Sequence, residues 1–210
     1  MAVSVNQAGN TVSGRLFILS GPSGVGKDTI LARAERLVPD LRRIVTVVTR
    51  PRRDSERPDV DYHFWSRDEF ERGCQRGAFL ESAEYVGNLY GTPRDGVVEA
   101  FRAKCDALLK IDVRGFRQVT REHAGAVSVF LLPPSIDVLE RHLRTARPGD
   151  GREDIERRLA AARTELSAAS EYTYRIVNEE GNPDFAAFRL ARIISDERAR
   201  SAPRLVTLRT

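Results

Sequence analysis

The sequence is poor in cysteine and lacks any long apolar run, and both absences narrow the classes of protein to which it can belong. Its two cysteines, Cys74 and Cys105, cannot form a disulfide framework and do not have the spacing of metal ligands. No apolar stretch approaches the roughly 20 residues that a membrane-spanning helix needs. The first thirteen residues lack the basic and apolar regions of a secretory signal. We therefore expect a cytoplasmic protein that does not enter a membrane, with flexible tails at residues 1–13 and 200–210.

The chain also lacks a large excess of charge of either sign. It has 34 basic and 30 acidic residues, which gives a net charge of +4 at pH 7. No recognised nucleic-acid-binding motif or aromatic platform accompanies the arginines, so we do not expect nucleic acid as a partner. The arginines instead gather within residues 41–57 and 141–158, an arrangement that suits bidentate capture of phosphate oxygens. A solvated helix face is the alternative interpretation for Arg141, Arg144, Arg152 and Arg157.

Internal repeats and low-complexity tracts are absent, and the pattern alternates strands with helices. We predict strands at residues 15–20, 43–48, 60–65, 78–85, 107–111, 127–132 and 174–177. Helices are predicted after a glycine-rich turn at residues 21–26 and at residues 68–76, 97–104, 115–122, 136–144, 154–170 and 184–200. Apolar strands with intervening helices indicate an α/β fold, a P-loop NTPase-like parallel sheet flanked by helices.

Two segments interrupt this alternation. Residues 47–93 are rich in polar and aromatic residues with short strands, which predicts an inserted, mostly β subdomain that binds a nucleoside monophosphate. Residues 145–152 are basic and rich in proline and glycine, which is typical of a short mobile lid. The predicted domain therefore covers residues 14–199, with a core made of residues 14–46, 94–144 and 153–199.

The strongest single motif is a phosphate-binding loop. It follows an apolar strand and opens a helix, the context that distinguishes a P-loop from a chance match. Glycines let successive backbone N–H groups converge, the helix N-terminus adds its dipole, and Lys27 is placed to bridge the β- and γ-phosphates. We therefore predict Lys27 as a catalytic residue and ATP as the ligand of Gly21, Pro22, Ser23, Gly24, Val25, Gly26, Lys27, Asp28 and Thr29.

One residue of this loop departs from the general motif. The position after the lysine should be Ser or Thr, whose hydroxyl binds Mg²⁺, but here it is Asp28, followed by Thr29. Asp112 follows the predicted strand 107–111, where a Walker-B-type acid would face the ligand. It could hold Mg²⁺ through water, accept hydrogen bonds from the acceptor substrate, or simply end the strand. The Mg²⁺ candidates Asp28, Thr29 and Asp112 stay open.

Several segments closely resemble those of guanylate kinases, the P-loop kinases that use ATP to phosphorylate GMP. The resemblance lies in residues 46–64 (TVVTRPRRDSERPDVDYHF), 79–93 (FLESAEYVGNLYGTP), 111–115 (IDVRG), 131–135 (LLPPS), 155–159 (IERRL) and 176–178 (IVN). It covers about residues 14–198, nearly the whole chain. The departures include Lys110, where many relatives have an acid, and His142, where some have arginine.

The resemblance implies a role for each matching residue. The phosphate of GMP would be bound by Arg50, Arg53, Tyr62 and Tyr90. The carboxylate of Glu81 would recognise guanine by accepting from the N1–H and 2-amino groups of the base. Further contacts in the acceptor site would come from Thr46, Thr92 and Asp112. Two catalytic arginines, Arg147 and Arg158, would close on the transferring phosphoryl group, and Asn178 would lie near the adenine of ATP.

The resulting prediction is a cytoplasmic transferase of purine nucleotide metabolism. It would phosphorylate GMP, and also dGMP, to the diphosphate with ATP and Mg²⁺, by in-line transfer. Its partners would be these small molecules, and the oligomeric state is left open. One alternative is a ribose 1,5-bisphosphate phosphokinase, which would not need Glu81. Another is a non-catalytic guanylate-kinase-like module that binds phosphopeptides, although such modules typically lose the P-loop lysine or the lid arginines.

Overall fold

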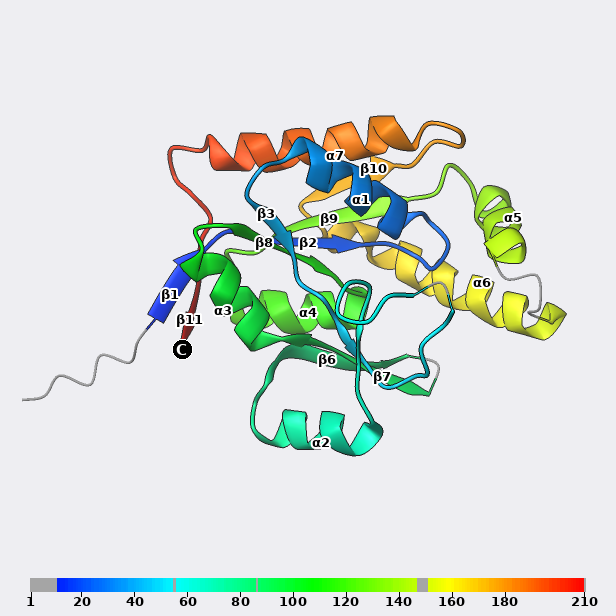
Figure 1. The fold of residues 1–210 in the computed structure, drawn as a ribbon. Helices are drawn as coiled ribbons and strands as arrows, with labels where there is room; N and C mark the ends of the chain where they lie inside the picture. Colours follow the sequence, from blue (N-terminus) through cyan, green and yellow to red (C-terminus); the bar gives the residue numbers. More distant parts are fainter. Residues whose placement is uncertain (1–10, 55, 86, 147–150, 210) are drawn as a thin grey trace, which may run out of the picture.

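The computed structural model describes residues 11–54, 56–85, 87–146 and 151–209, and its centre is a five-stranded sheet (Figure 1). The strands lie in the order β10 (Tyr174–Val177), β9 (Val127–Leu132), β2 (Leu16–Ser20), β8 (Asp106–Lys110) and β3 (Leu41–Arg43). Every adjacent pair in this sheet is parallel. The prediction of a parallel α/β core is confirmed.

Strand β2 shows how one apolar run fills two cores. All five of its residues are buried, as expected for a strand covered on both faces. Phe17 and Leu19 belong to the core on one face, whereas Leu16 and Ile18 belong to the core on the other. Because successive side chains of a strand point to opposite faces, the alternation follows directly from the pleat.

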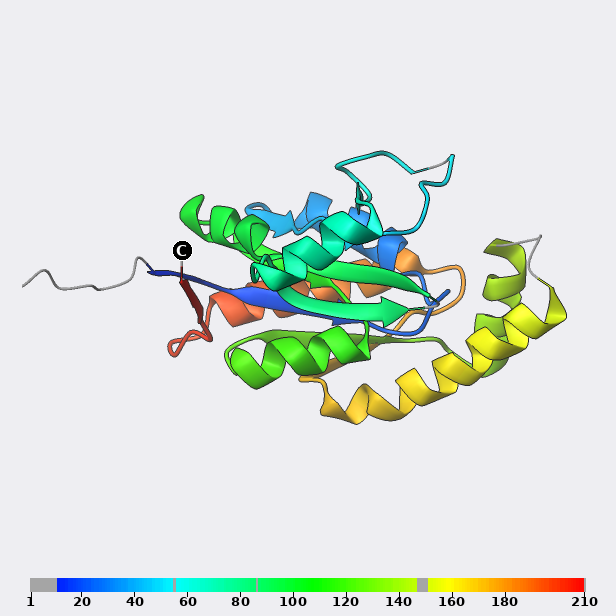
Figure 2. The same ribbon diagram turned by 90° about the horizontal axis from the view of Figure 1, so that it is seen from below.

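Helices cover both faces, as the two perpendicular views show (Figures 1 and 2). One core includes buried residues of α1 (Lys27–Leu37) and α7 (Pro183–Arg198), and the other includes residues of α3 (Arg94–Arg102) and α4 (Val113–Glu122). Beyond the carboxyl ends of the strands, α5 (Ile136–Ala146) packs against α6 (Arg152–Ser167), which continues into the short 3₁₀ helix η1 (Ala168–Glu171). None of the helices in the described part of the chain is both long and apolar enough to cross a bilayer.

A second, smaller sheet is built from the predicted insert. Its strands lie in the order β5 (His63–Phe64), β4 (Val47–Val48), β7 (Asn88–Pro93) and β6 (Phe79–Tyr85), below the central sheet in Figure 1. Helix α2 (Arg67–Gln75) covers it, and the rings of Phe70 and Phe79 stack with centroids 4.4 Å apart. Ser66 and Glu69 form a capping box that fixes the start of α2.

The predicted strand at residues 43–48 is wrong, because this segment belongs to two sheets. Residues up to Arg43 form β3 in the central sheet, and the N–H of Ile44 still donates to Leu108 of β8. The chain then crosses to β4 in the second sheet. Ile44, Val47 and Val48 are all buried, so the apolar pattern is continuous although the strand is not. Strand β7, which pairs with β4 and β6, had not been predicted as a strand.

The predicted tails also need correction. Thr11–Gly14 forms strand β1, which pairs antiparallel with β11 (Val206–Arg209) at the end of the molecule away from α5 (Figure 1). Val206 and Leu208 are buried and pack in the same core as Phe101 of α3. Part of each predicted tail is therefore anchored, because its apolar side chains complete a core. Residues 1–10 lie outside the described residues, as do residues 147–150 of the predicted lid.

Candidate active site

The phosphate-binding loop lies between β2 and α1, where the sequence places it. Gly26 is the N-cap of α1 and has φ of 94°, in the left-handed region that favours glycine. A Cβ at this position would also lie 2.7 Å from Nδ2 of Asn178. That amide donates to the carbonyl of Val25 at 2.9 Å, so Asn178 braces the loop from β10's carboxyl end. Its Oδ1 is buried and has no hydrogen-bond partner in the part of the chain that the structure describes.

Lys27 folds back over its own loop. Its ammonium donates to the carbonyls of Gly21 and Pro22, the latter at 3.1 Å. Burial lowers the pKa of Lys27, and the nearby carboxylate of Glu165 opposes that shift. Glu165 had not been predicted as a site residue. It lies on α6 seven residues after Arg158, which puts both on the same face of that helix, and this spacing is the signal that could have found it.

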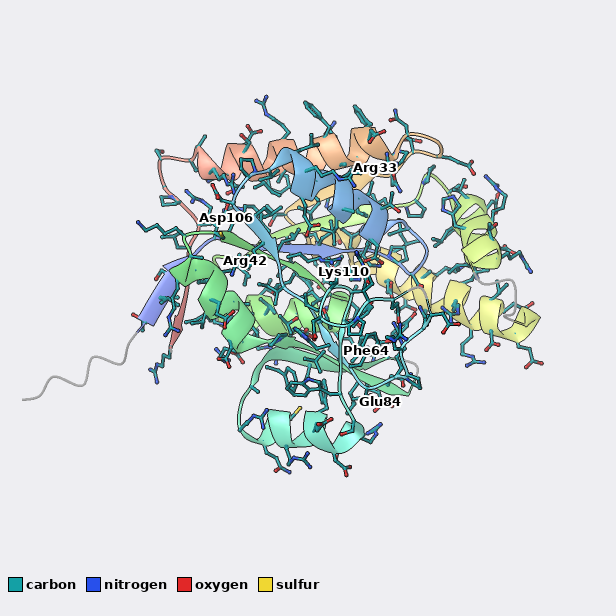
Figure 3. The ribbon with its side chains drawn as sticks, in the orientation of Figure 1. Arg33, Arg42, Phe64, Glu84, Asp106 and Lys110 are labelled. Atoms are coloured by element: carbon teal, nitrogen blue, oxygen red, sulfur yellow. The ribbon has the colours of Figure 1, made fainter. Side chains whose placement is uncertain are left out.

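Asp28 is paired with a lysine from the opposite side of the site. Its Oδ1 lies 2.6 Å from Nζ of Lys110, at the end of β8, and the same ammonium donates to the hydroxyl of Tyr62 at 3.2 Å. Partial desolvation opposes ionisation of Asp28, but Lys110, with Lys27 and Arg43, outweighs this effect and lowers the pKa of that carboxyl. Lys110 had been noted only as a departure from the family pattern. In Figure 3 it lies between the central sheet and the second sheet, above Phe64.

On the acceptor side, the guanidinium groups of Arg50 and Arg53 lie against the carboxylate of Glu56. Arg50 and Glu56 form a two-pronged ion pair, with Nη1 2.7 Å from Oε2, and Nη1 of Arg53 lies 3.6 Å from the same carboxylate. The hydrogen bonds from Arg50 lower the pKa of Glu56 to about 2 despite the opposing effect of burial. The Arg50 guanidinium lies 5.0 Å from the ring centre of Tyr62, whose ring meets that of Tyr90 edge to face. Glu56 was missed as a site residue, although it lies within the quoted motif.

Glu81 is buried at the far end of the same site, on β6. It is only 5% exposed, and Thr92 on the neighbouring strand β7 donates to its Oε1 at 2.6 Å. Burial raises the pKa of Glu81 to about 7, with Asp112 adding to the rise and Thr92 opposing it. A Cβ on Gly115 would lie 2.5 Å from Oε2 of Glu81, so α4 needs a glycine where it passes this carboxylate.

Asp112 has a local structural role as well as a position in the site. Its Oδ1 accepts from the N–H of Gly115 at 2.9 Å and caps α4. It follows Lys110 at the carboxyl edge of the central sheet, where ligands of open α/β sheets bind. Thr46 is also buried beside this edge, and its carbonyl accepts from the N–H of His63.

One cavity of about 440 Å³ brings most of the predicted residues together. Those that line it are Gly21, Ser23, Gly24, Gly26, Lys27, Asp28, Thr29, Thr46, Arg50, Arg53, Tyr62, Glu81, Tyr90 and Asp112, joined by the unpredicted Lys110 and Glu165. Pro22, Val25, Thr92, Asn178 and Arg158 are not among its lining residues, and Arg147 lies outside the described residues. The cavity is thus lined by the phosphate-binding loop, by the guanidinium and phenol groups of Arg50, Arg53, Tyr62 and Tyr90, and by the buried carboxylate of Glu81.

The position of Glu81 predicts a pH dependence of GMP binding. A guanine offers two donors, which an ionised carboxylate can accept and a protonated one cannot both accept. The resemblance implies that Glu81 accepts from guanine, and Glu81 is neutral below its pKa of about 7, so we expect the affinity for GMP to fall about tenfold for each pH unit below 7. Above pH 7 the affinity should be constant. Calorimetric titration with GMP between about pH 5.5 and pH 8.5 measures this.

The matched control for this titration is Thr92→Val. The hydroxyl of Thr92 stabilises the ionised form of Glu81, so its removal should move the midpoint to higher pH. The phosphate of GMP titrates near pH 6, and the variant does not change that step. A midpoint that is identical in the wild type and in Thr92→Val would show that Glu81 is not the titrating group.

Known proteins resemble this chain in sequence and in fold. A family model described as guanylate kinase matches residues 13–197. A guanylate kinase from Nitrosospira multiformis is 44% identical over 196 residues, which cover 93% of this chain and 92% of that protein. One from Nostoc sp. is 41% identical over 182 residues, or 87% and 91% of the two chains. The crystal structure of guanylate kinase from Anaplasma phagocytophilum has a TM-score of 0.72 and 30% identity, covering 92% of this chain and 90% of that one. The chain therefore belongs to the guanylate kinase family.

Proposed function

We propose that the chain transfers the γ-phosphoryl group of ATP in line to GMP and to dGMP, with Mg²⁺, and serves purine nucleotide metabolism. Membership of the guanylate kinase family makes it an ATP-dependent GMP kinase. The observation that supports the proposal best is that Lys27 of the phosphate loop, Arg50 and the buried Glu81 line the same cavity. The proposed contacts to the acceptor fall on its base and phosphate, so the absence of the 2′-hydroxyl in dGMP should be tolerated.

We assign the acceptor phosphate to Arg50, Arg53, Tyr62 and Tyr90. All four line the cavity, and guanidinium and phenol groups are donors that suit phosphate oxygens. Glu56 holds Arg50 in its present orientation, so little side-chain entropy remains to be lost when the phosphate arrives. At the other end, the ionised Glu81 would accept from the guanine N1–H and 2-amino group. Thr92 donates to Glu81 and would orient its carboxylate in the acceptor site.

We assign the donor to the phosphate loop, with Lys27 exchanging its loop carbonyls for the β- and γ-phosphate oxygens. Arg158, together with Arg147 of the predicted lid, would neutralise charge that develops on the transferring group. The unpartnered Oδ1 of Asn178 supports its proposed place near adenine, because that oxygen could accept from the exocyclic amino group. Closure of the predicted lid would exclude water and so suppress hydrolysis of ATP.

The side chains also fit a magnesium ion held mainly by the substrate. Mg²⁺ usually takes one or two protein ligands and completes its shell with phosphate oxygens and water. Thr29 and Asp112 line the cavity, and Asp112 uses one oxygen to cap α4. Within the described residues, no three Asp, Glu, His or Cys side chains are grouped so that they could hold a metal by themselves. When bound, the ion would neutralise negative charge on the phosphates of ATP, with Thr29 and Asp112 as the side chains that would hold it. Asp28 is the weakest of the three candidates, because the cationic Lys110 already neutralises the charge of its carboxylate.

A coupled assay of ADP formation tests this proposal. ATP and Mg²⁺ are supplied with GMP, dGMP, AMP, UMP or ribose 1,5-bisphosphate in separate reactions. We expect turnover with GMP and dGMP and little with AMP or UMP. Turnover with the sugar bisphosphate alone would favour the first alternative. Absence of turnover with every acceptor would favour a phosphopeptide-binding module.

A further inference from the structure

Asp28 and Lys110 are the two residues of the cavity wall that depart from their expected types, and they bind each other. The pair is 2.6 Å apart and joins the first turn of α1 to the end of β8, 82 residues further along the chain. Leu19 of β2 is directly opposite Lys110 in the parallel register, which brings the two strand ends to the same edge of the sheet. The contact therefore depends on the fold and is not a local feature of the loop.

Lys110 is the more buried member of this pair. Its side chain is 12% exposed, whereas that of Asp28 is 72% exposed. The ammonium donates to the hydroxyl of Tyr62 and lies 4.8 Å from the centre of that ring. The Arg50 guanidinium approaches the same ring at 5.0 Å. Lys110 thus contacts Tyr62, one of the residues that we assign to the acceptor phosphate. Its partner Asp28 belongs to the phosphate loop that we assign to ATP.

Charge and hydrogen-bonding capacity both suit Lys110 to a phosphate. Burial alone would lower the pKa of Lys110, but Tyr62 and Asp28 outweigh it and raise the pKa, so the group is cationic at neutral pH. An ammonium has three donors. Two are used by Asp28 and Tyr62, and the third has no acceptor among the residues that the structure describes. Arg50 and Arg53, by contrast, both already contact Glu56.

We propose that Lys110 is a further substrate-binding residue, whose ammonium contacts the acceptor phosphate beside Tyr62, and that Asp28 is the residue that positions it. The inference rests on the proposed role of Arg50, Arg53, Tyr62 and Tyr90 in binding the acceptor phosphate. It gives the aspartate of the loop a function that is independent of the metal: Asp28 holds a cation between the donor and acceptor phosphates. The rival explanation is that Lys110 only masks the negative charge of Asp28, so that ATP can approach.

Three variants separate these explanations: Lys110→Met, Asp28→Asn and the double variant. Dissociation constants for GMP alone and for ATP alone are measured by calorimetry. If Lys110 binds the acceptor phosphate, Lys110→Met should weaken GMP binding about 10- to 100-fold, the usual cost of one charge-assisted hydrogen bond, and leave ATP binding within about twofold. Asp28→Asn should weaken GMP binding about threefold, as expected for loss of an exposed ion-pair partner. In the double variant the loss should equal that of Lys110→Met.

The rival explanation gives the opposite pattern. An unmasked Asp28 would weaken ATP binding in Lys110→Met, and the double variant would recover it. That recovery, or GMP binding by Lys110→Met equal to that of the wild type, would overturn the proposal. Retained ATP binding shows that Lys110→Met is folded, and an equal loss of both ligands with a lowered melting temperature would indicate a structural role and also overturn it. Failure of the wild type to bind GMP would instead contradict the proposed acceptor.

Discussion

Replacing Lys27 with methionine is expected to lower kcat by about 10³-fold and to leave the affinity for GMP unchanged. The ammonium is buried at the mouth of the phosphate loop, where its partners are two neutral carbonyl groups. Phosphoryl transfer depends on positioning and charge neutralisation rather than on covalent chemistry by the protein. Methionine keeps the apolar stem but removes the charge that would meet the β- and γ-phosphates. Initial rates in the coupled assay give kcat, and calorimetry gives the GMP affinity.

Lys104→Met is the matched control for Lys27→Met. Lys104 is exposed after the end of α3 and does not line the cavity, and its positive φ of 58° strains lysine and methionine alike. Its removal should leave kcat unchanged. If Lys27→Met keeps kcat within about tenfold of the wild type, Lys27 does not neutralise the transferring group. A parallel loss of GMP affinity would mean that the substitution has disturbed the whole cavity.

The phosphate loop could be predicted from sequence because all its determinants are consecutive. A buried strand, glycines that can adopt positive φ and a helix start lie within residues 16–37. Gly26 illustrates the point, since both its backbone conformation and the close approach of Asn178 require a residue without a side chain. No knowledge of the sheet order is needed for such a motif.

The acceptor site was predicted through resemblance, since no periodicity links its parts. Arg50 lies in the segment after β4, Tyr62 lies just before β5, and Glu81 lies on β6. The strand order β5-β4-β7-β6 of the second sheet brings these segments to one cavity. The resemblance implies that Thr92 contributes a contact in the acceptor site, and in the structure this residue is 1% exposed and donates to Glu81.

Contacts that depend on strand order could not be predicted. The Asp28–Lys110 pair exists because β2 and β8 are neighbours in the central sheet, although the second sheet and α3 separate them in sequence. The pairing of β1 with β11 was missed for the same reason. Both strands are short, and only Val206 and Leu208 of β11 are buried, so local propensity gives little indication of either strand.

The second large effect is expected at Glu81, where Glu81→Gln should lower kcat/KM for GMP by about 10³-fold. The buried carboxylate lines the cavity and offers two acceptor oxygens, which would suit the two guanine donors. A glutamine of the same shape keeps one acceptor oxygen and turns an amide N–H toward the second donor, so one charge-assisted bond becomes a repulsion. Glu84→Gln, the same change at an exposed position on β6 (Figure 3), should have no effect.

The acceptor profile of Glu81→Gln separates recognition of guanine from a general loss of structure. Because adenine has an acceptor at N1 and no amino group at C2, glutamine should not reduce the low activity with AMP, and the preference for GMP over AMP should narrow by about 10³-fold. The substitution also removes a buried group whose pKa is about 7. The fall in GMP affinity below pH 7 should therefore disappear in Glu81→Gln, apart from the titration of GMP itself. Equal loss of GMP and AMP activity would indicate a general loss of structure. A variant that keeps the pH dependence of the wild type would show that guanine is recognised by another residue.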